Sequence, residues 1–111
     1  MSIKVNTLSE SPRSMVTYIL LVTLTEQGRQ NFKASYTTTR EEFKKQVGKL
    51  GGKITGYVTA GPYDAIEIID MPNDDGALAI LLGSLSVNEI RTVTLRAFHE
   101  DQVKKTLQQM T

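Results

Sequence analysis

Six side chains in this sequence have the chemistry that a ligand-binding or proton-transfer site needs. The stretch GPYD at positions 61–64 holds two of them, Tyr63 and Asp64. Asp64 could act as a general base, with Tyr63 as a hydrogen-bond donor, if burial or a like charge raised its pKa toward neutrality. The simpler interpretation is a tight turn, because Gly, Pro and Asp favour turns and an Asp side chain readily bonds nearby backbone.

The remaining four candidates are Tyr57, Glu67, Arg96 and His99. Glu67 or His99 could move a proton, while Arg96 could hold an anionic substrate through a two-pronged hydrogen bond. The alternative is a network at a dimer interface, with Glu67 and Tyr57 bonded across a sheet and His99 in the first turn of a terminal helix. Buried polar groups need partners whether or not a ligand exists, so the interface interpretation stays open beside the functional one.

The residue counts exclude several kinds of chemistry. The chain has 111 residues, which fits one domain. It has no cysteine and one histidine, so disulfides, cysteine nucleophiles and zinc sites built on Cys or several His residues are excluded within one chain. Asp70, Asn73, Asp74 and Asp75 lack the spacing of a calcium-binding loop, and helix capping explains them more simply. We therefore predict no metal and no cofactor.

Charge and hydropathy argue against nucleic acid and membranes as partners. The formal net charge of +1 creates no field that would attract a polyanion. The middle strands offer no aromatic platform for bases, and Gly51-Gly52 follows a helix instead of opening one as a phosphate loop does. The longest apolar run near the N-terminus, residues 19–22, is too short to span a bilayer. With no secretory signal either, a cytoplasmic protein is expected.

Hydrophobic periodicity predicts the elements that would position these side chains. In residues 17–25 the odd and the even positions both carry apolar side chains. This pattern indicates a central strand covered on both faces. A capping-box pattern at Thr38 or Thr39 predicts the start of a helix that ends at Gly51-Gly52. The other predicted elements are strands 53–60, 64–70 and 90–98, an apolar helix 76–86 and an amphipathic helix 99–110. Residues 1–14 are expected to form a flexible tail ahead of a single domain, 15–111.

This order predicts an α+β fold of the ferredoxin-like βαββαβ kind with an extra C-terminal helix. Both main helices would cover one face of a four-stranded antiparallel sheet in the order 4-1-3-2. If Val93, Leu95 and Ala97 face the helices, the other face is polar and aromatic. That face would carry Thr55, Tyr57, Thr59, Glu67, Thr92, Thr94, Arg96 and Phe98, with Tyr57 opposite Glu67. Such a face favours a homodimer joined sheet to sheet, in a barrel that encloses a partly polar cavity.

Three stretches resemble the GYD domain family, a group of small bacterial proteins of dimeric α/β-barrel type. They are TYILLVTLTEQG (17–28), KLGGKITGYVTAGPYDAIEIIDMPND (49–74) and IRTVTLRAF (90–98). The Gly, Tyr and Asp of the family signature look like Gly61, Tyr63 and Asp64, with Pro62 between the first two. The resemblance implies the fold and dimerisation, but no activity.

Three functions remain as hypotheses. The first is a homodimer that binds a small organic molecule, with no assigned reaction. The second is a cofactor-independent enzyme similar to the antibiotic-biosynthesis monooxygenase group, which rests on analogy of fold. The third is an oligomeric interaction module that docks a partner through the apolar helix or the terminal helix.

Overall fold

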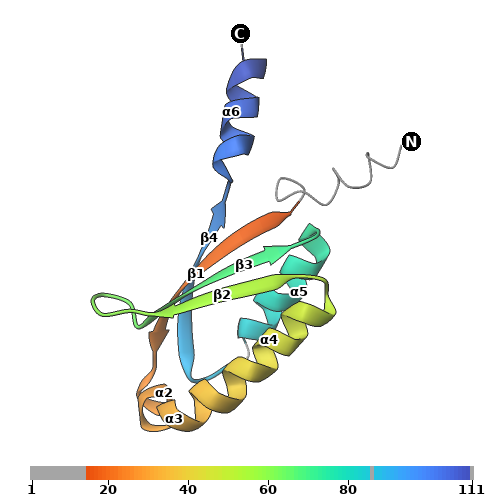
Figure 1. The fold of residues 1–111 in the computed structure, drawn as a ribbon. Coiled ribbons are helices and arrows are strands. Elements are labelled where there is room, and N and C mark those ends of the chain that lie inside the picture. The colour runs from red at the N-terminus through yellow and green to blue at the C-terminus, as the bar shows by residue number, and fades with distance from the viewer. Residues whose placement is uncertain (1–14, 86, 111) are drawn as a thin grey trace.

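The computed structural model of the chain describes residues 15–85 and 87–110, so the predicted tail at 1–14 lies outside the described residues. The predicted order of elements is confirmed (Figure 1). The strands are β1 (Val16–Leu24), β2 (Lys53–Val58), β3 (Ala65–Met71) and β4 (Ile90–Ala97). The helices are α2 (Glu26–Gln30), α3 (Phe32–Ala34), α4 (Arg40–Lys49), α5 (Asp74–Leu85) and α6 (Glu100–Gln109), with a π-helical segment η2 (Ser35–Thr39) before α4.

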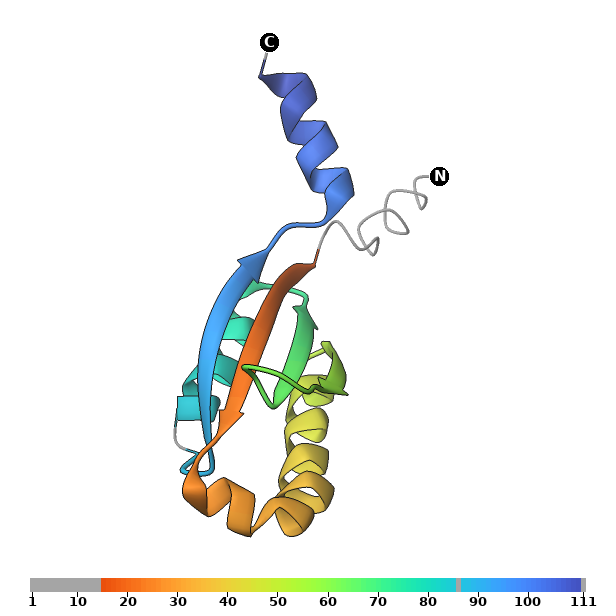
Figure 2. The ribbon, with the colours of Figure 1, turned by 90° about the vertical axis from the view of Figure 1, so that its left-hand side faces the viewer.

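The four strands form one antiparallel sheet in the order β2-β3-β1-β4, as the sequence predicts. Helices α4 and α5 cover one face of this sheet, and no helix of residues 15–85 or 87–110 covers the opposite face (Figures 1 and 2). The fold is therefore the predicted α+β, ferredoxin-like sandwich. Helix α6 follows β4 and projects beyond the end of the sheet.

The hydrophobic core lies between the central strands and the two helices. It consists of Leu20, Val22, Ile69, Met71, Val47, Ala77 and Ile80. Burial of a large aliphatic side chain contributes about 1.5–3 kcal/mol, so these residues supply much of the force that holds α4 and α5 on the sheet. The central position of β1, expected from its apolar residues on both alternations, is confirmed by its pairing with both β3 and β4.

A helical region precedes the first main helix. Thr25 caps α2, and its hydroxyl oxygen accepts a hydrogen bond from the Gly28 amide at 3.1 Å, as expected of an N-cap. From Glu26 to Lys49 the chain then stays almost continuously helical. The predicted capping box at Thr38 or Thr39 is wrong, since Thr39 has helical φ and ψ angles and no side-chain capping bond. The chain is already helical before Thr39, so carbonyl groups of the preceding turns accept hydrogen bonds from the first amides of α4. A side-chain cap at Thr39 would therefore have no free amide to bond.

The strand register reverses part of the predicted assignment of faces. Leu20 is buried under the helices and pairs with Glu67 on one side and Thr94 on the other. Paired residues point to the same face, so Glu67, Thr92, Thr94 and Arg96 lie on the helix-bearing face, contrary to the prediction. Tyr57 pairs with Ile66, so the expected Tyr57–Glu67 pair is also wrong. A register shift of one residue is enough to exchange the two faces of a strand.

The face without helices is apolar at its centre. Six residues form this centre, and we call it the uncovered face: Ile19, Leu21, Ile66, Ile68, Val93 and Leu95. Val93 and Leu95 are 48% and 44% exposed. Thr55 and Tyr57 border it, as predicted. The charged residues of this face, Lys53, Asp70 and Arg91, stand toward the strand ends.

Within the described residues, no helix is both long and apolar enough to cross a membrane.

Candidate functional site

A groove of about 440 Å³ opens on the helix-bearing side of the sheet. Its floor comes from β1 and β3, one wall comes from the helical run α3 to α4, and the other wall comes from α5. Its apolar surface includes Leu20, Val22, Phe32, Tyr36, Phe43 and Ile80. Binding sites for small molecules have this size and this predominance of apolar and aromatic side chains. We call this cavity the groove.

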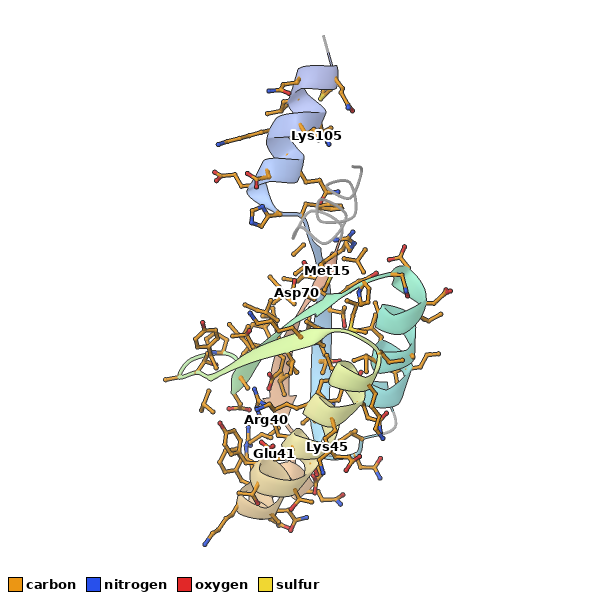
Figure 3. All side chains as sticks on the ribbon, turned by 45° about the vertical axis from the view of Figure 1, so that its right-hand side comes forward. Met15, Arg40, Glu41, Lys45, Asp70 and Lys105 are labelled. Atoms are coloured by element: carbon orange, nitrogen blue, oxygen red, sulfur yellow. The ribbon has the colours of Figure 1, made fainter. Side chains whose placement is uncertain are left out.

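One ion pair lies within the apolar surroundings of the groove. Arg40 stands where α4 begins (Figure 3), and its Nη2 atom lies 3.1 Å from Oε1 of Glu67, in the middle of β3. The side chains are only 19% and 16% exposed. The pair therefore joins α4 to the sheet at a point where water has little access.

Gly56 makes room for this ion pair. It is the cross-strand neighbour of Glu67, and a Cβ atom at this position would lie 2.0 Å from Arg40 Nη2 and 2.3 Å from Glu67 Oε1. These distances are far shorter than van der Waals contact. A side chain at position 56 would push the Arg40 guanidinium or the Glu67 carboxylate out of the positions they hold here.

Glu67 has a perturbed acidity. Desolvation by burial raises its pKa above the ordinary value of 4.5, and the charge of Arg40 opposes this rise only in part. Burial disfavours the charged form of a carboxyl group, whereas a nearby cation favours it. A carboxyl group that holds its proton more firmly than usual, in a concave apolar site, is the kind of group found at functional sites.

Asp64 lies at the edge of the groove and ties the β2–β3 turn to the end of β1. Its Oδ2 atom accepts a hydrogen bond from the Leu24 amide at 2.8 Å, and its own amide donates to the Val22 carbonyl at 2.8 Å. The Thr59 hydroxyl donates to the Tyr63 carbonyl at 2.7 Å and closes the turn. These contacts favour the structural interpretation of Tyr63 and Asp64. The partner of the carboxylate is a neighbouring strand instead of the turn's own backbone.

Arg96 and His99 lie outside the groove lining, toward the end of the sheet where α6 begins. The guanidinium carbon of Arg96 lies 4.5 Å from the ring centre of Phe98 and 5.5 Å from that of Tyr18. Its Nη1 atom donates to the backbone carbonyls of Thr17 and Ala97. His99 caps α6 and accepts the Asp101 amide at its Nδ1 atom, 3.2 Å away. Both side chains thus fix the departure of α6 from the sheet.

The structure brings together half of the predicted candidates. Tyr57, Asp64 and Glu67 border the groove, whereas Tyr63, Arg96 and His99 do not. Sequence reasoning missed Arg40 as a site residue. The available signal was its place on the apolar face of its helix, between Tyr36 and Phe43, where an unpaired cation would be costly.

The fold and the groove define a class: ferredoxin-like α+β proteins with a binding-sized cavity between the helices and the sheet. The family model for the GYD domain matches residues 18–107, so the chain belongs to the GYD domain family. No curated protein matches the chain.

Two solved structures share the fold. MtbAldR superposes with a TM-score of 0.56 at 14% sequence identity, covering 77% of this chain. The chain spans only 53% of the length of MtbAldR. TTHA0845 from Thermus thermophilus superposes with a TM-score of 0.50 at 22% identity, covering 77% of this chain and 95% of TTHA0845. At these identities the likeness concerns the fold alone.

Proposed function

We propose that this GYD-domain protein is a small-molecule-binding homodimer whose ligand occupies the groove between α4 and α5. The observation that carries the proposal is the groove itself, an apolar cavity with the Arg40–Glu67 ion pair among its lining residues. Apolar walls provide affinity for a small molecule, and a few placed polar groups orient it. The proposed ligand site lies between the sheet and its helices, whereas the sequence suggested a cavity between the sheets of two protomers.

The uncovered face supports the dimer. Six apolar side chains gather at the centre of this face, and two of them, Val93 and Leu95, are exposed. Contiguous apolar side chains on a surface mark an interaction site more often than plain solvent surface. A second copy of the chain offers an identical apolar face, as the two-fold symmetry of a homodimer requires. The sequence argued for a dimer from a polar and aromatic face. The present argument for a dimer rests instead on an apolar face.

A neutral apolar dye, Nile red, provides the test of the groove. We expect saturable binding of one dye per protomer, with increased fluorescence. The substitution Ala79→Trp places a large ring at the α5 wall of the groove and should abolish this binding. Leu78→Trp is the matched control, because Leu78 is the adjacent residue of α5 and is 54% exposed outside the groove lining.

Two results would contradict the proposed site. One is the absence of saturable dye binding to the folded wild-type protein. The other is binding that Ala79→Trp leaves unchanged, since the dye would then occupy the uncovered face or the outer surface of α5. Circular dichroism of both tryptophan variants checks that the fold is retained.

One observation favours the enzyme as a second candidate function. Glu67 lines the groove, and burial raises the pKa of its carboxyl group, as a general acid requires. His99, the other proton-transfer candidate, caps α6 away from the groove, so a reaction in the groove would depend on Glu67.

A further inference from the structure

The charges that line the groove are unbalanced. Its charged residues are Arg40, Glu42, Asp64, Glu67 and Glu89, one cation among four carboxyl groups. Arg40 is paired with Glu67, which leaves the other three carboxylates without a positive counterpart in the lining. The lining of the groove therefore carries more negative than positive formal charge, although the whole chain carries a formal net charge of +1.

The hydrogen-bond partners of these three carboxylates are neutral. Asp64 accepts the Leu24 amide. Glu89 accepts the Ser35 hydroxyl at 2.5 Å and the Asn31 side-chain amide at 3.3 Å. Glu42 accepts the Gln46 side-chain amide at 3.5 Å. Neutral donors position a carboxylate without cancelling its charge, so the site retains its attraction for a cation.

Glu67 has an oxygen atom available to a ligand. Arg40 contacts Oε1 through a single nitrogen atom, so Oε2 can accept a further hydrogen bond. The aromatic rings of Phe32, Tyr36 and Phe43 belong to the helical wall of the same groove, and aromatic faces attract ammonium groups. The Phe32 and Tyr36 rings are neighbours, with their centroids 5.6 Å apart.

We propose that the groove binds an apolar molecule that carries a protonated amine. This inference rests on the proposed function and adds the ligand's chemical class. The apolar part would lie against Leu20, Val22 and Ile80, with the ammonium group among the carboxylates. A ligand carboxylate is disfavoured, because it would become a fifth acidic group and would have to compete with Glu67 for Arg40.

Three probes with the same alkyl chain test the class: decylamine, decanol and decanoate, measured by calorimetry below their micelle concentrations. We expect decylamine to bind at least about tenfold more tightly than decanol, and decanoate most weakly, because a charge-assisted hydrogen bond exceeds a neutral one. The amine preference should shrink as salt is added, because ions screen the carboxylates at the mouth of the groove.

Substitutions of single carboxylates test which residues produce the preference for decylamine. Glu67→Gln and Glu89→Gln should each weaken decylamine binding severalfold while leaving decanol binding nearly unchanged, since only the charge is lost. Retained decanol binding shows that each variant is folded. Glu41→Gln is the control, because Glu41 is adjacent to Glu42 but pairs with Lys44 on the exposed side of α4 and does not line the groove.

The outcomes separate the two proposals. Decanoate binding equal to or tighter than decylamine binding would overturn the amine class and leave the small-molecule site intact. A decylamine preference that is insensitive to both Glu→Gln changes would also overturn it. Failure of all three probes to bind at the groove would count against the proposed function itself.

Discussion

The two faces of the sheet are both apolar, but they differ in shape and charge. The helix-bearing face is hollowed into the groove and holds the Arg40–Glu67 ion pair. The uncovered face has six aliphatic side chains at its centre and no charge among them. Concave sites with a few polar groups suit small ligands, whereas the buried centres of protein interfaces are depleted of charged residues. The difference favours the proposal that the groove takes a small ligand and the uncovered face takes a second copy of the chain.

The largest expected effect concerns the uncovered face. Ile19 and Ile68 are direct cross-strand neighbours there. The double variant Ile19→Glu, Ile68→Glu places like charges in the centre of the proposed interface, where single residues can contribute about 2 kcal/mol or more to association. We expect the dimer to dissociate, with a dimerisation constant weakened by more than about 100-fold, as measured by analytical ultracentrifugation.

The control for this change is Leu78→Glu, on the outer surface of α5, which should leave the dimer intact. Loss of assembly in the control would instead support the interaction-module hypothesis, with α5 as the docking surface. A wild-type protein that sediments as a monomer at micromolar concentration would contradict the proposal that the uncovered face is a dimer interface.

The next effect concerns the ion pair. Arg40→Met leaves the Glu67 carboxylate without its cation in a site with little water. We expect a loss of about 1–3 kcal/mol in the free energy of unfolding near neutral pH, below the cost of a fully buried pair because some solvent reaches both groups. Urea denaturation measures the change.

The double variant Arg40→Met, Glu67→Gln is the matched control, since it removes both charges. Its stability should lie closer to the wild type than that of Arg40→Met alone. Equal losses in the single and double variants would show that Arg40 contributes through packing of its aliphatic stem and not through its charge.

The smallest expected effect is a dependence of stability on pH. The pKa of Glu67 is raised in the folded chain, so the native state keeps this proton to higher pH than the unfolded state does. Its contribution to stability is therefore fully present below the ordinary carboxyl pKa of 4.5 and is lost as the pH rises through the raised value. The difference in unfolding free energy between wild type and Glu67→Gln should change in this direction in a urea titration series. A difference that is constant from acid to neutral pH would contradict it.

Local patterns in the sequence predicted the framework of this fold. The apolar residues in both alternating sets of 17–25 predicted a central strand, and the structure places β1 between β3 and β4. The Gly-Pro dipeptide at 61–62 marked the β2–β3 turn for a similar local reason. Such features depend on neighbours in the chain, which a sequence displays directly.

The register between the strands determines which residues of β4 face the helices and which residues meet at the candidate site. In β4, threonines alternate with aliphatic residues, and the prediction placed the aliphatic set under the helices. The structure places that set on the uncovered face, which is also apolar, so hydropathy could not distinguish the two arrangements. The Arg40–Glu67 pair joins residues 27 positions apart and exists only at one register of β2, β3 and α4, which no local pattern specifies.

The hydrogen bond from the Leu24 amide to the Asp64 carboxylate has a consequence for how the cavity is held open. The aspartate that matches the GYD signature secures a hairpin to the neighbouring strand, at the edge of the groove and not on its floor. Loss of this carboxylate would free the turn from β1 and leave the charges of the cavity, Arg40 and Glu67 among them, in place. The frame of the cavity and its chemical character therefore depend on different residues.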